Sequence, residues 1–245
     1  MNSKYISPFP TLNFPIYSGP RKTDNLIYEA WHEYMCLWLD SSRESEFLAK
    51  PHINIYSGAE GLPAQALATL HSESPIARID GTERESSGTE HWEDYDDVVV
   101  LAEHSYTLYA TSAVDNQTPI GFIQLNLSIR YYPLEKDISV NCYIERIYAA
   151  RDKRRQHVGA ALIFATAEIV QKHSGEVLSQ CKLMPESCPL VEELEIYLYA
   201  ELHSEEGENM VNLLKSELEV FIDDYKMEHE DEQIKIKGVD LEAGY

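Results

Sequence analysis

The chain has 245 residues, of which 44% are hydrophobic and 25% charged, and its formal net charge is −22. This length suits one large domain or two small ones. The acidic charge argues against non-specific binding to nucleic acid, because phosphate contacts need Lys and Arg. Residues 1–19 lack the apolar core of a signal peptide, and no run of 18 apolar residues is present in the sequence. We therefore expect a cytoplasmic protein without a membrane partner.

The cysteines and the late histidines carry no metal-binding signature. Only Cys181 and Cys188 lie close together, and their spacing is not a zinc pattern. His203 and His229 lack partners at metal-ligand spacing. We predict reduced thiols and no metal site.

Residues 1–95 are irregular in composition and are expected to form an N-terminal extension packed on the main domain. Pro, Ser and Tyr are frequent in residues 1–21, which predicts an extended arm. Apolar positions at helical spacing predict a helix over residues 24–39 and a short helix near residues 62–71. Residues 79–97 are polar and acidic, as in a surface loop.

The main domain is predicted to span residues 96–245. Strand-like sequence recurs in three successive segments, which predict an antiparallel meander: residues 98–114, 120–132 and 138–150. Four further elements follow in the order helix, strand, helix, strand: residues 156–173, 193–202, 205–225 and 233–241. Residues 174–191 contain two Cys and two Pro and are expected to be irregular.

This order predicts an α+β (α/β) fold with a mixed, mostly antiparallel central sheet flanked by helices. Strands 138–150 and 193–202 are joined through a helix, which predicts a parallel pair with a right-handed crossover.

A basic run stands out against the acidic background, because four of the 20 Lys and Arg residues lie within residues 151–155. The run sits where strand 138–150 gives way to a helix. The first turn of a helix presents unpartnered N–H groups and the positive end of its dipole, so the junction predicts an anion site. Arg154 and Arg155 add charge there, and Gly159 leaves room for a close approach. A pyrophosphate suits such a site.

The segment IERIYAARDKRRQHVGAALI, residues 144–163, resembles the acyl-CoA-binding motif of the GNAT superfamily of N-acetyltransferases. In that family the pattern (Arg/Gln)-x-x-Gly-x-(Gly/Ala) follows a strand and opens a helix. Two registers fit. One starts at Arg154 and places His157 at the first glycine, and the other starts at Gln156 and matches every required position. We favour the register from Arg154, which keeps Arg in the leading position. The order of elements from Val98 to Tyr225 also resembles the family.

The resemblance implies that acetyl-CoA is the co-substrate and that strands 138–150 and 193–202 splay apart to admit its pantetheine. The backbone of Ile147, Tyr148 and Ala149 would pair with the pantetheine. The remaining implied cofactor-binding residues belong to the loop, the helix start and the start of the later helix: Arg154, Arg155, Gln156, His157, Val158, Gly159, Ala160 and Asn209. Asn212 is the alternative to Asn209.

The family's chemistry also needs a base that takes a proton from the attacking ammonium group. Glu145 is the candidate, and Tyr143 stands where many relatives carry a Glu. If the strand is unbulged, Glu145 shares a face with Tyr143 and Ile147. The alternative is that Glu145 is a solvent-facing charge without a catalytic role.

The family's common general acid is a Tyr late in its fourth helix. Counting from Asn209 or Asn212 leads to Ser216 or Glu219, and Tyr225 comes later than the pattern allows. The sequence therefore leaves open whether a dedicated acid exists.

The acceptor is expected to be a cationic primary amine, because residues 192–232 hold 15 Asp and Glu but 2 Lys, a local charge of −13. Polyamines, aminoglycoside-like amines and the Lys side chains of proteins all meet this description. Two alternatives stay open, namely a GNAT-like module that binds acyl-CoA without turnover and a protein-interaction domain with an acidic face. The sequence also leaves the oligomeric state open, a homodimer included.

Overall fold

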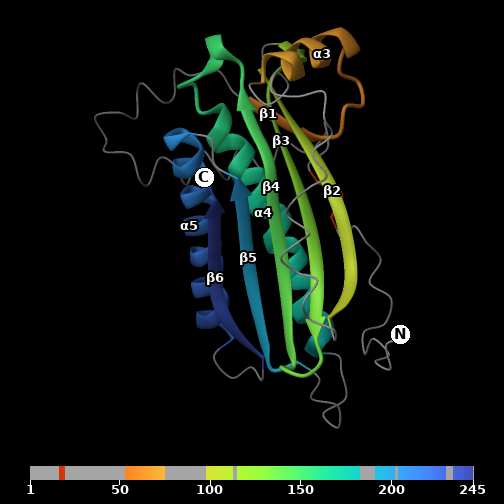
Figure 1. Ribbon diagram of the computed structural model, residues 1–245, viewed down its shortest axis with the longest axis vertical. Coiled ribbons are helices and arrows are strands. Elements are labelled where there is room, and N and C mark those ends of the chain that lie inside the picture. The colour runs from red at the N-terminus through yellow and green to blue at the C-terminus, as the bar shows by residue number, and fades with distance from the viewer. Residues whose placement is uncertain are drawn as a thin grey trace.

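Six strands form one sheet in the computed structural model, in the order β1-β2-β3-β4-β5-β6 (Figure 1). The structure describes residues 17–19, 53–74, 98–112, 115–182, 191–201, 204–229 and 234–244. The predicted helix over residues 24–39, the acidic loop and most of the predicted arm lie outside these ranges, as do Cys188 and His203.

The elements are β1 (Ile53–Ser57), α3 (Ala64–Glu73), β2 (Val99–Ser112), β3 (Asp115–Tyr132), β4 (Asp137–Ala149), α4 (Val158–Lys182), β5 (Glu193–Glu201), α5 (Glu205–Glu228) and β6 (Lys235–Gly244). From α3 onwards they follow one another in the predicted order, whereas the strand before it, β1, was not predicted. Strands β1 to β4 pair antiparallel, whereas β4 with β5 and β5 with β6 pair parallel. The predicted fold class is therefore confirmed: the sheet is mixed, mostly antiparallel and flanked by helices.

One predicted boundary was wrong, because α4 continues to Lys182 through residues expected to be irregular. Ser174 and Gly175 favour a break on propensity alone. Val177, Leu178 and Cys181 are nevertheless buried and continue the helix's apolar stripe, so packing outweighs the local preference.

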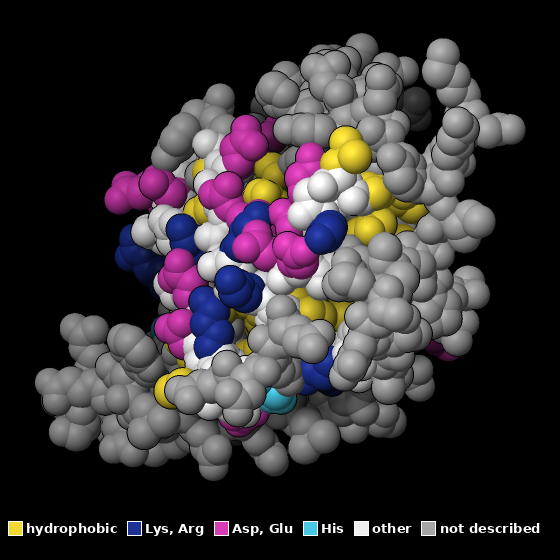
Figure 2. All heavy atoms as spheres, turned by 90° about the horizontal axis from the view of Figure 1, so that it is seen from below, with side chains coloured by type: hydrophobic (Ala, Val, Ile, Leu, Met, Phe, Trp, Pro, Cys, Tyr) yellow, Lys and Arg dark blue, Asp and Glu magenta, His cyan; other side chains and the backbone are white. Residues whose placement is uncertain are grey.

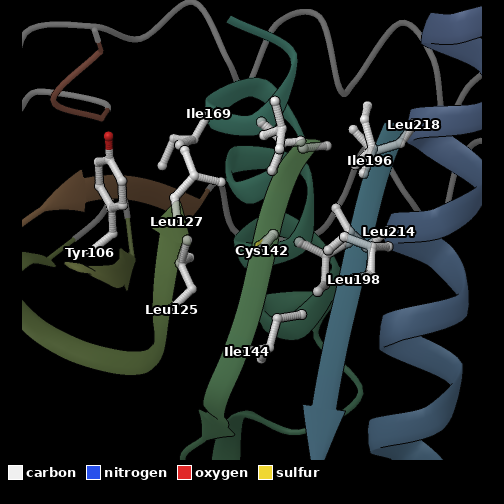
Figure 3. Packing of buried hydrophobic residues seen from close by; sticks show 14 of the residues in the cluster. Tyr106, Leu125, Leu127, Cys142, Ile144, Ile169, Ile196, Leu198, Leu214 and Leu218 are labelled. Atoms are coloured by element: carbon white, nitrogen blue, oxygen red, sulfur yellow. The ribbon is translucent and has the colours of Figure 1, made fainter. Parts of the chain in front are cut away.

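The strand alternation places the hydrophobic core on one face of the sheet. In β3, Ile123, Leu125, Leu127 and Ile129 are all at most 1% exposed, and polar residues lie between them. Helices α4 and α5 cover this face, with Leu214 and Leu218 of α5 against β5 (Figure 3). Each aliphatic side chain buried here stabilises the fold by about 1.5–3 kcal/mol.

The opposite face of the sheet is polar, and α3 covers part of it. Leu70 of α3 packs on an aromatic row that crosses three strands: Tyr109, Phe122 and Tyr148. α3 lies at the end of the sheet where β4 ends and α4 begins (Figure 1). Both β1 and α3 precede residue 96, and β1 pairs with β2 in the same sheet. The predicted domain boundary at this residue stays a prediction.

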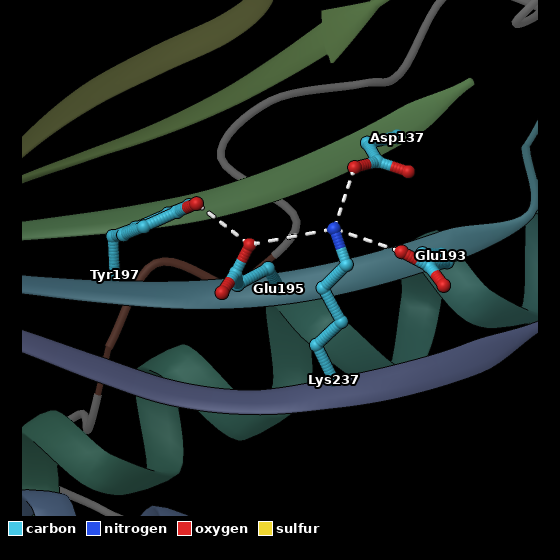
Figure 4. A network of polar contacts seen from close by, with 5 residues as sticks. All are labelled: Asp137, Glu193, Glu195, Tyr197 and Lys237. Carbon is cyan, nitrogen blue, oxygen red and sulfur yellow. Dashed lines mark hydrogen bonds and ion pairs between the residues drawn. The ribbon is translucent and has the colours of Figure 1, made fainter. Parts of the chain in front are cut away.

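The other end of the sheet, where β4 and β5 begin, carries a cluster of ion pairs. Lys237 of β6 lies 2.8 Å from carboxylate oxygens of both Asp137 and Glu193 and 3.9 Å from Glu195 (Figure 4). Tyr197 donates a hydrogen bond of 2.6 Å to Glu195. Viewed from this end, basic and acidic side chains lie beside each other (Figure 2). Within the described ranges, no helix is both long and apolar enough to cross a membrane.

Candidate active site

Strands β4 and β5 part before β4 ends. Their parallel pairing runs from Asp137 opposite Glu193 to Ile144 opposite Ala200. The last residues of β4, 146–149, remain paired with β3 on the other side, up to Gly121 opposite Ala149. Their edge towards β5 has no strand partner in the described part of the chain. Backbone N–H and C=O groups on that edge suit an extended ligand with amide groups.

A β-bulge marks the point of divergence. Leu125 pairs with Ile144 and Gln124 with Arg146, so Glu145 is the extra residue. The strand is therefore bulged, and the condition under which Glu145 would share a face with both Tyr143 and Ile147 is not met. Ile147 now lies opposite Ile123 and packs on the apolar core, on the other face from Tyr143.

The carboxylate of Glu145 is exposed and held by hydrogen bonds that cross three strands. Asn126 of β3 donates from Nδ2 to Glu145 Oε1 over 2.6 Å, and Ser105 of β2 donates to Asn126 Oδ1 over 2.5 Å. The alternation of β3 predicts a polar face for Asn126, but the register that joins these three residues is not visible in the sequence. The hydrogen bonds thus orient an exposed carboxylate that a ligand from solution can reach.

Tyr143 lies beside Glu145 on the same polar face. Burial raises the pKa of its phenol, and the negative charges of Glu201 and Glu145 raise it further. The phenol stays protonated near neutral pH and can donate a hydrogen bond. Tyr199 of β5 stands opposite Tyr143 in the parallel register, and its pKa is also raised, first by burial and then by the charge of Glu242. The structure thus brings Glu145, Tyr143 and a second tyrosine together.

The basic run forms a tight connection between β4 and α4. Residues Arg151–Lys153 make a short 3-10 helix, and α4 begins at Val158. Arg155 and His157 have φ values of 61° and 62°, in the left-handed region that favours glycine. His157 therefore has the backbone of a glycine at the position where the preferred motif register has the first glycine. Its carbonyl accepts the first helical bond, from Ala161 over 3.0 Å.

Two glycines allow the start of α4 to pack closely. A Cβ on Gly121 of β3 would lie 2.6 Å from Val158 Cγ1 and 2.8 Å from the carbonyl oxygen of Tyr148. A Cβ on Gly159 would lie 3.1 Å from Met210 Sδ of α5. The exposed Asn209 directly precedes Met210, so the start of α5 lies beside the start of α4. Sequence reasoning missed Gly121, since nothing local distinguishes it from other strand glycines.

The remaining loop residues present charge and amide groups to solvent. Arg154 and Arg155 are exposed, and the Arg154 guanidinium lies 6.0 Å from the centre of the Tyr148 ring. Gln156 donates from Nε2 to the carbonyl oxygen of Asp152 over 3.1 Å. The N–H groups of the first turn, which include those of Gly159 and Ala160, have no partner within the helix. Together these groups suit a pyrophosphate.

The candidates for a general acid on α5 do not reach this site. Ser216 and Glu219 are exposed, and Glu219 lies 3.8 Å from Lys215. Tyr225 stacks on His229 with ring centres 4.3 Å apart. The helical rise puts Tyr225 about 22 Å along the axis from Met210. Tyr143 is the better-placed phenol.

Helix α3 brings one more group to this end of the sheet. His71 Nε2 lies 2.9 Å from the Tyr109 hydroxyl, and its ring is 4.3 Å from that of Phe122. Burial lowers the pKa of His71, and the positive charge of Arg146 lowers it further. Sequence reasoning missed this histidine. In the described part of the chain, no group of three or more His, Cys, Asp and Glu residues could hold a metal ion.

Comparison with known proteins identifies a family. Residues 66–187 match the acetyltransferase (GNAT) family. No curated protein matches the sequence.

Solved structures of low similarity include acetyltransferases. An aminoglycoside acetyltransferase from an uncultured soil metagenomic sample, in complex with trehalose, is 15% identical and has a TM-score of 0.35, with 67% of this chain and 86% of that chain covered. AAC(6')-Iy in complex with a bisubstrate analogue is 16% identical, with 68% and 89% covered and a TM-score of 0.34. A ribosomal-protein-alanine N-acetyltransferase from Brucella melitensis biovar Abortus 2308 is 17% identical, with 50% and 74% covered and a TM-score of 0.31.

Proposed function

Through residues 66–187 the chain belongs to the acetyltransferase (GNAT) family, and from this premise we propose that it transfers an acetyl group from acetyl-CoA to a cationic primary amine. The observation that carries the proposal is the divergence of β4 from β5 directly after Ile144, with the Arg154–His157 loop at the end of the diverging segment. The free edge of β4, whose backbone can pair with amides, is followed by the loop with its proposed anion site. The pantetheine amides and the pyrophosphate follow each other in the same way in acetyl-CoA.

The proposed donor contacts follow from this geometry. The backbone of Ile147, Tyr148 and Ala149 pairs with the pantetheine amides along the free edge of β4. The pyrophosphate accepts hydrogen bonds from the first turn of α4 and from Arg154 and Arg155. Asn209, at the start of α5, adds a polar group beside that turn.

The proposed chemistry is a direct attack. Glu145 takes a proton from the acceptor's ammonium group, and the neutral nitrogen attacks the thioester carbonyl carbon. An N–C bond forms, the C–S bond breaks, and the thiolate of coenzyme A leaves with the electron pair. The nitrogen, positively charged after the attack, loses its second proton to solvent to give the neutral amide. Tyr143 can give its proton to the thiolate and then regain one from solvent.

A cationic acceptor fits the side chains around the point of divergence. Glu145, Glu201 and Glu242 supply negative charge, and Tyr143 and Tyr199 supply phenol oxygens. A site lined by one sign of charge concentrates ligands of the opposite sign. The acidic segment of residues 192–232, with its local charge of −13, would add to this effect at longer range.

The test is a mass spectrum of the products formed from acetyl-CoA and a mixed amine library. We expect mono-acetylated cationic amines and free coenzyme A, with a rate that falls steeply as salt is added. Acetylation of neutral amines alone would contradict the cationic acceptor. Stabilisation by acetyl-CoA without any transfer would instead favour a binding module, the alternative suggested by the absence of a Tyr at positions 216 and 219.

A further inference from the structure

Arg146 is an unusual charge for its position. It is only partly exposed, yet it forms no hydrogen bond or ion pair within the described residues. The chain holds 42 Asp and Glu against 20 Lys and Arg, so carboxylates are abundant. Half-buried guanidinium groups are normally paired, since an unpaired charge loses hydration without compensation. A partner from outside the chain would remove this cost.

The bulge brings Arg146 and Glu145 to the same face of the sheet. Consecutive residues of a regular strand point to opposite faces. Glu145 bonds to Asn126 on the polar face, and Arg146 lies opposite Gln124 on that same face, two residues before Tyr148. Its charge also reaches His71 of α3, which packs there. A carboxylate and a guanidinium thus lie side by side at the point of divergence.

The two groups do not neutralise each other. Glu145 takes its hydrogen bond from the Asn126 amide, and no ion pair joins it to Arg146 within the described residues. Arg146 is also separate from the basic loop, because Tyr148 lies between them and faces Arg154. The arrangement offers one negative and one positive group to a single ligand.

We propose that Arg146 binds a carboxylate of the acceptor, so that the acceptor is an amino acid with a net positive charge. This inference rests on the proposed acetyl transfer and narrows its substrate class. The acceptor's amine lies at Glu145, and its carboxylate takes two parallel hydrogen bonds from the guanidinium. A second basic group keeps the ligand cationic and lies towards Glu201 and Glu242.

The test compares amines that differ only in the carboxylate. Lysine is set against 1,5-diaminopentane and ornithine against 1,4-diaminobutane, and kcat and KM are measured for each with saturating acetyl-CoA. We expect kcat/KM to favour the amino acid by about ten- to a hundredfold, as for a charged hydrogen-bonded pair. Arg146→Gln should remove this preference by raising KM for the amino acid, with kcat little changed. Arg146→Lys should keep part of it, because it retains the charge without the planar fork.

The control is Lys215→Gln, which removes a positive charge from α5 and should leave the preference intact. Equal kcat/KM values for the diamines and the matching amino acids in the unmodified protein would overturn the inference but leave the proposed function standing. An equal loss for both members of each pair in Arg146→Gln would overturn it as well, as would loss of the stabilisation by acetyl-CoA. No transfer to any amine would contradict the proposed function itself.

Discussion

The two ends of the β4–β5 pair use similar side chains for different purposes. At the end where the strands begin, Asp137 and Glu193 both contact the ammonium group of Lys237, and Glu195 accepts a hydrogen bond from Tyr197 (Figure 4). At the end where they part, Glu145 has the Asn126 amide rather than a cation as its partner. Carboxylates next to tyrosines are structural where the fold supplies its own ammonium group. Where it does not, as at Glu145, we propose that they bind an ammonium group from solution.

The comparison also explains why the strands can separate without loss of the fold. Buried side chains from β4 and β5 pack against α4 and α5 along the paired segment, with Cys142 and Leu198 both 0% exposed (Figure 3). Beyond Ile144, β4 keeps its pairing with β3 and its aromatic contact through Phe122 and Tyr148. Within the described residues, the open end of the pair, beyond Ile144, is therefore supported by β3 but not by β5.

The strongest test of the open end is Glu145→Gln. If Glu145 is the base, kcat should fall about 10²- to 10⁴-fold, because proton transfer from the ammonium group is lost. Stability should change by less than about 0.5 kcal/mol, since the new amide oxygen can still accept from Asn126. Steady-state transfer and thermal unfolding measure the two effects.

The matched control is Glu195→Gln. Glu195 lies on the same face of the sheet, at the closed end, where β4 and β5 begin and are paired. It should keep kcat, because its partners are Tyr197 and Lys237 rather than a substrate. Equal activity of both variants would show that Glu145 is a surface charge.

A smaller effect is expected from Gly159→Glu, which tests whether the start of α4 binds the pyrophosphate of acetyl-CoA. The new side chain would crowd Met210 and bring a negative charge to the proposed pyrophosphate position. Acetyl-CoA at 100 times its Kd should stabilise the unmodified protein by about 2.7 kcal/mol and the variant not at all. Thermal unfolding with and without acetyl-CoA measures this difference.

Gly175→Glu is the control for this substitution, because a Cβ at Gly175 would meet no described atom within 4 Å beyond the neighbouring backbone of its own helix. It lies in the same helix, and its unfolding should respond to acetyl-CoA as the unmodified protein does. Retained stabilisation of Gly159→Glu would place the diphosphate elsewhere.

Much of the fold can be predicted from the sequence, because alternation and helical spacing are local properties. The predicted strands at 138–150 and 193–202 correspond to Asp137–Ala149 and Glu193–Glu201, and the helix at 205–225 to Glu205–Glu228. Ser204 caps α5, with its hydroxyl accepting from the Gly207 N–H over 3.1 Å. These elements follow from residues near one another in the chain.

The candidate site depends on relations that the sequence does not display. The bulge at Glu145 arises from the register between β3 and β4, and it alone decides that Arg146 and Glu145 share a face. Other contacts of the site join residues from different elements. Asn126 and Ser105 support Glu145 through hydrogen bonds, and His71 packs on Phe122. The motif in residues 154–159 predicts an anion site at the start of α4, and both this site and its ligands stay predictions.

The smallest expected effect concerns the closed end, through Lys237→Met. The ammonium group lies between Asp137 and Glu193 but is partly exposed, with 40% of its side chain accessible, so its loss should lower the free energy of unfolding by about 1 kcal/mol. Added salt should shrink the difference, because it screens both the lost attraction and the carboxylate repulsion left behind. Lys235→Met, on the same strand, should have no comparable effect. Transfer activity should be unchanged in both variants. A loss of activity without a loss of stability would mean that the closed end also serves the ligand, and the division between a structural and a functional end would then be wrong.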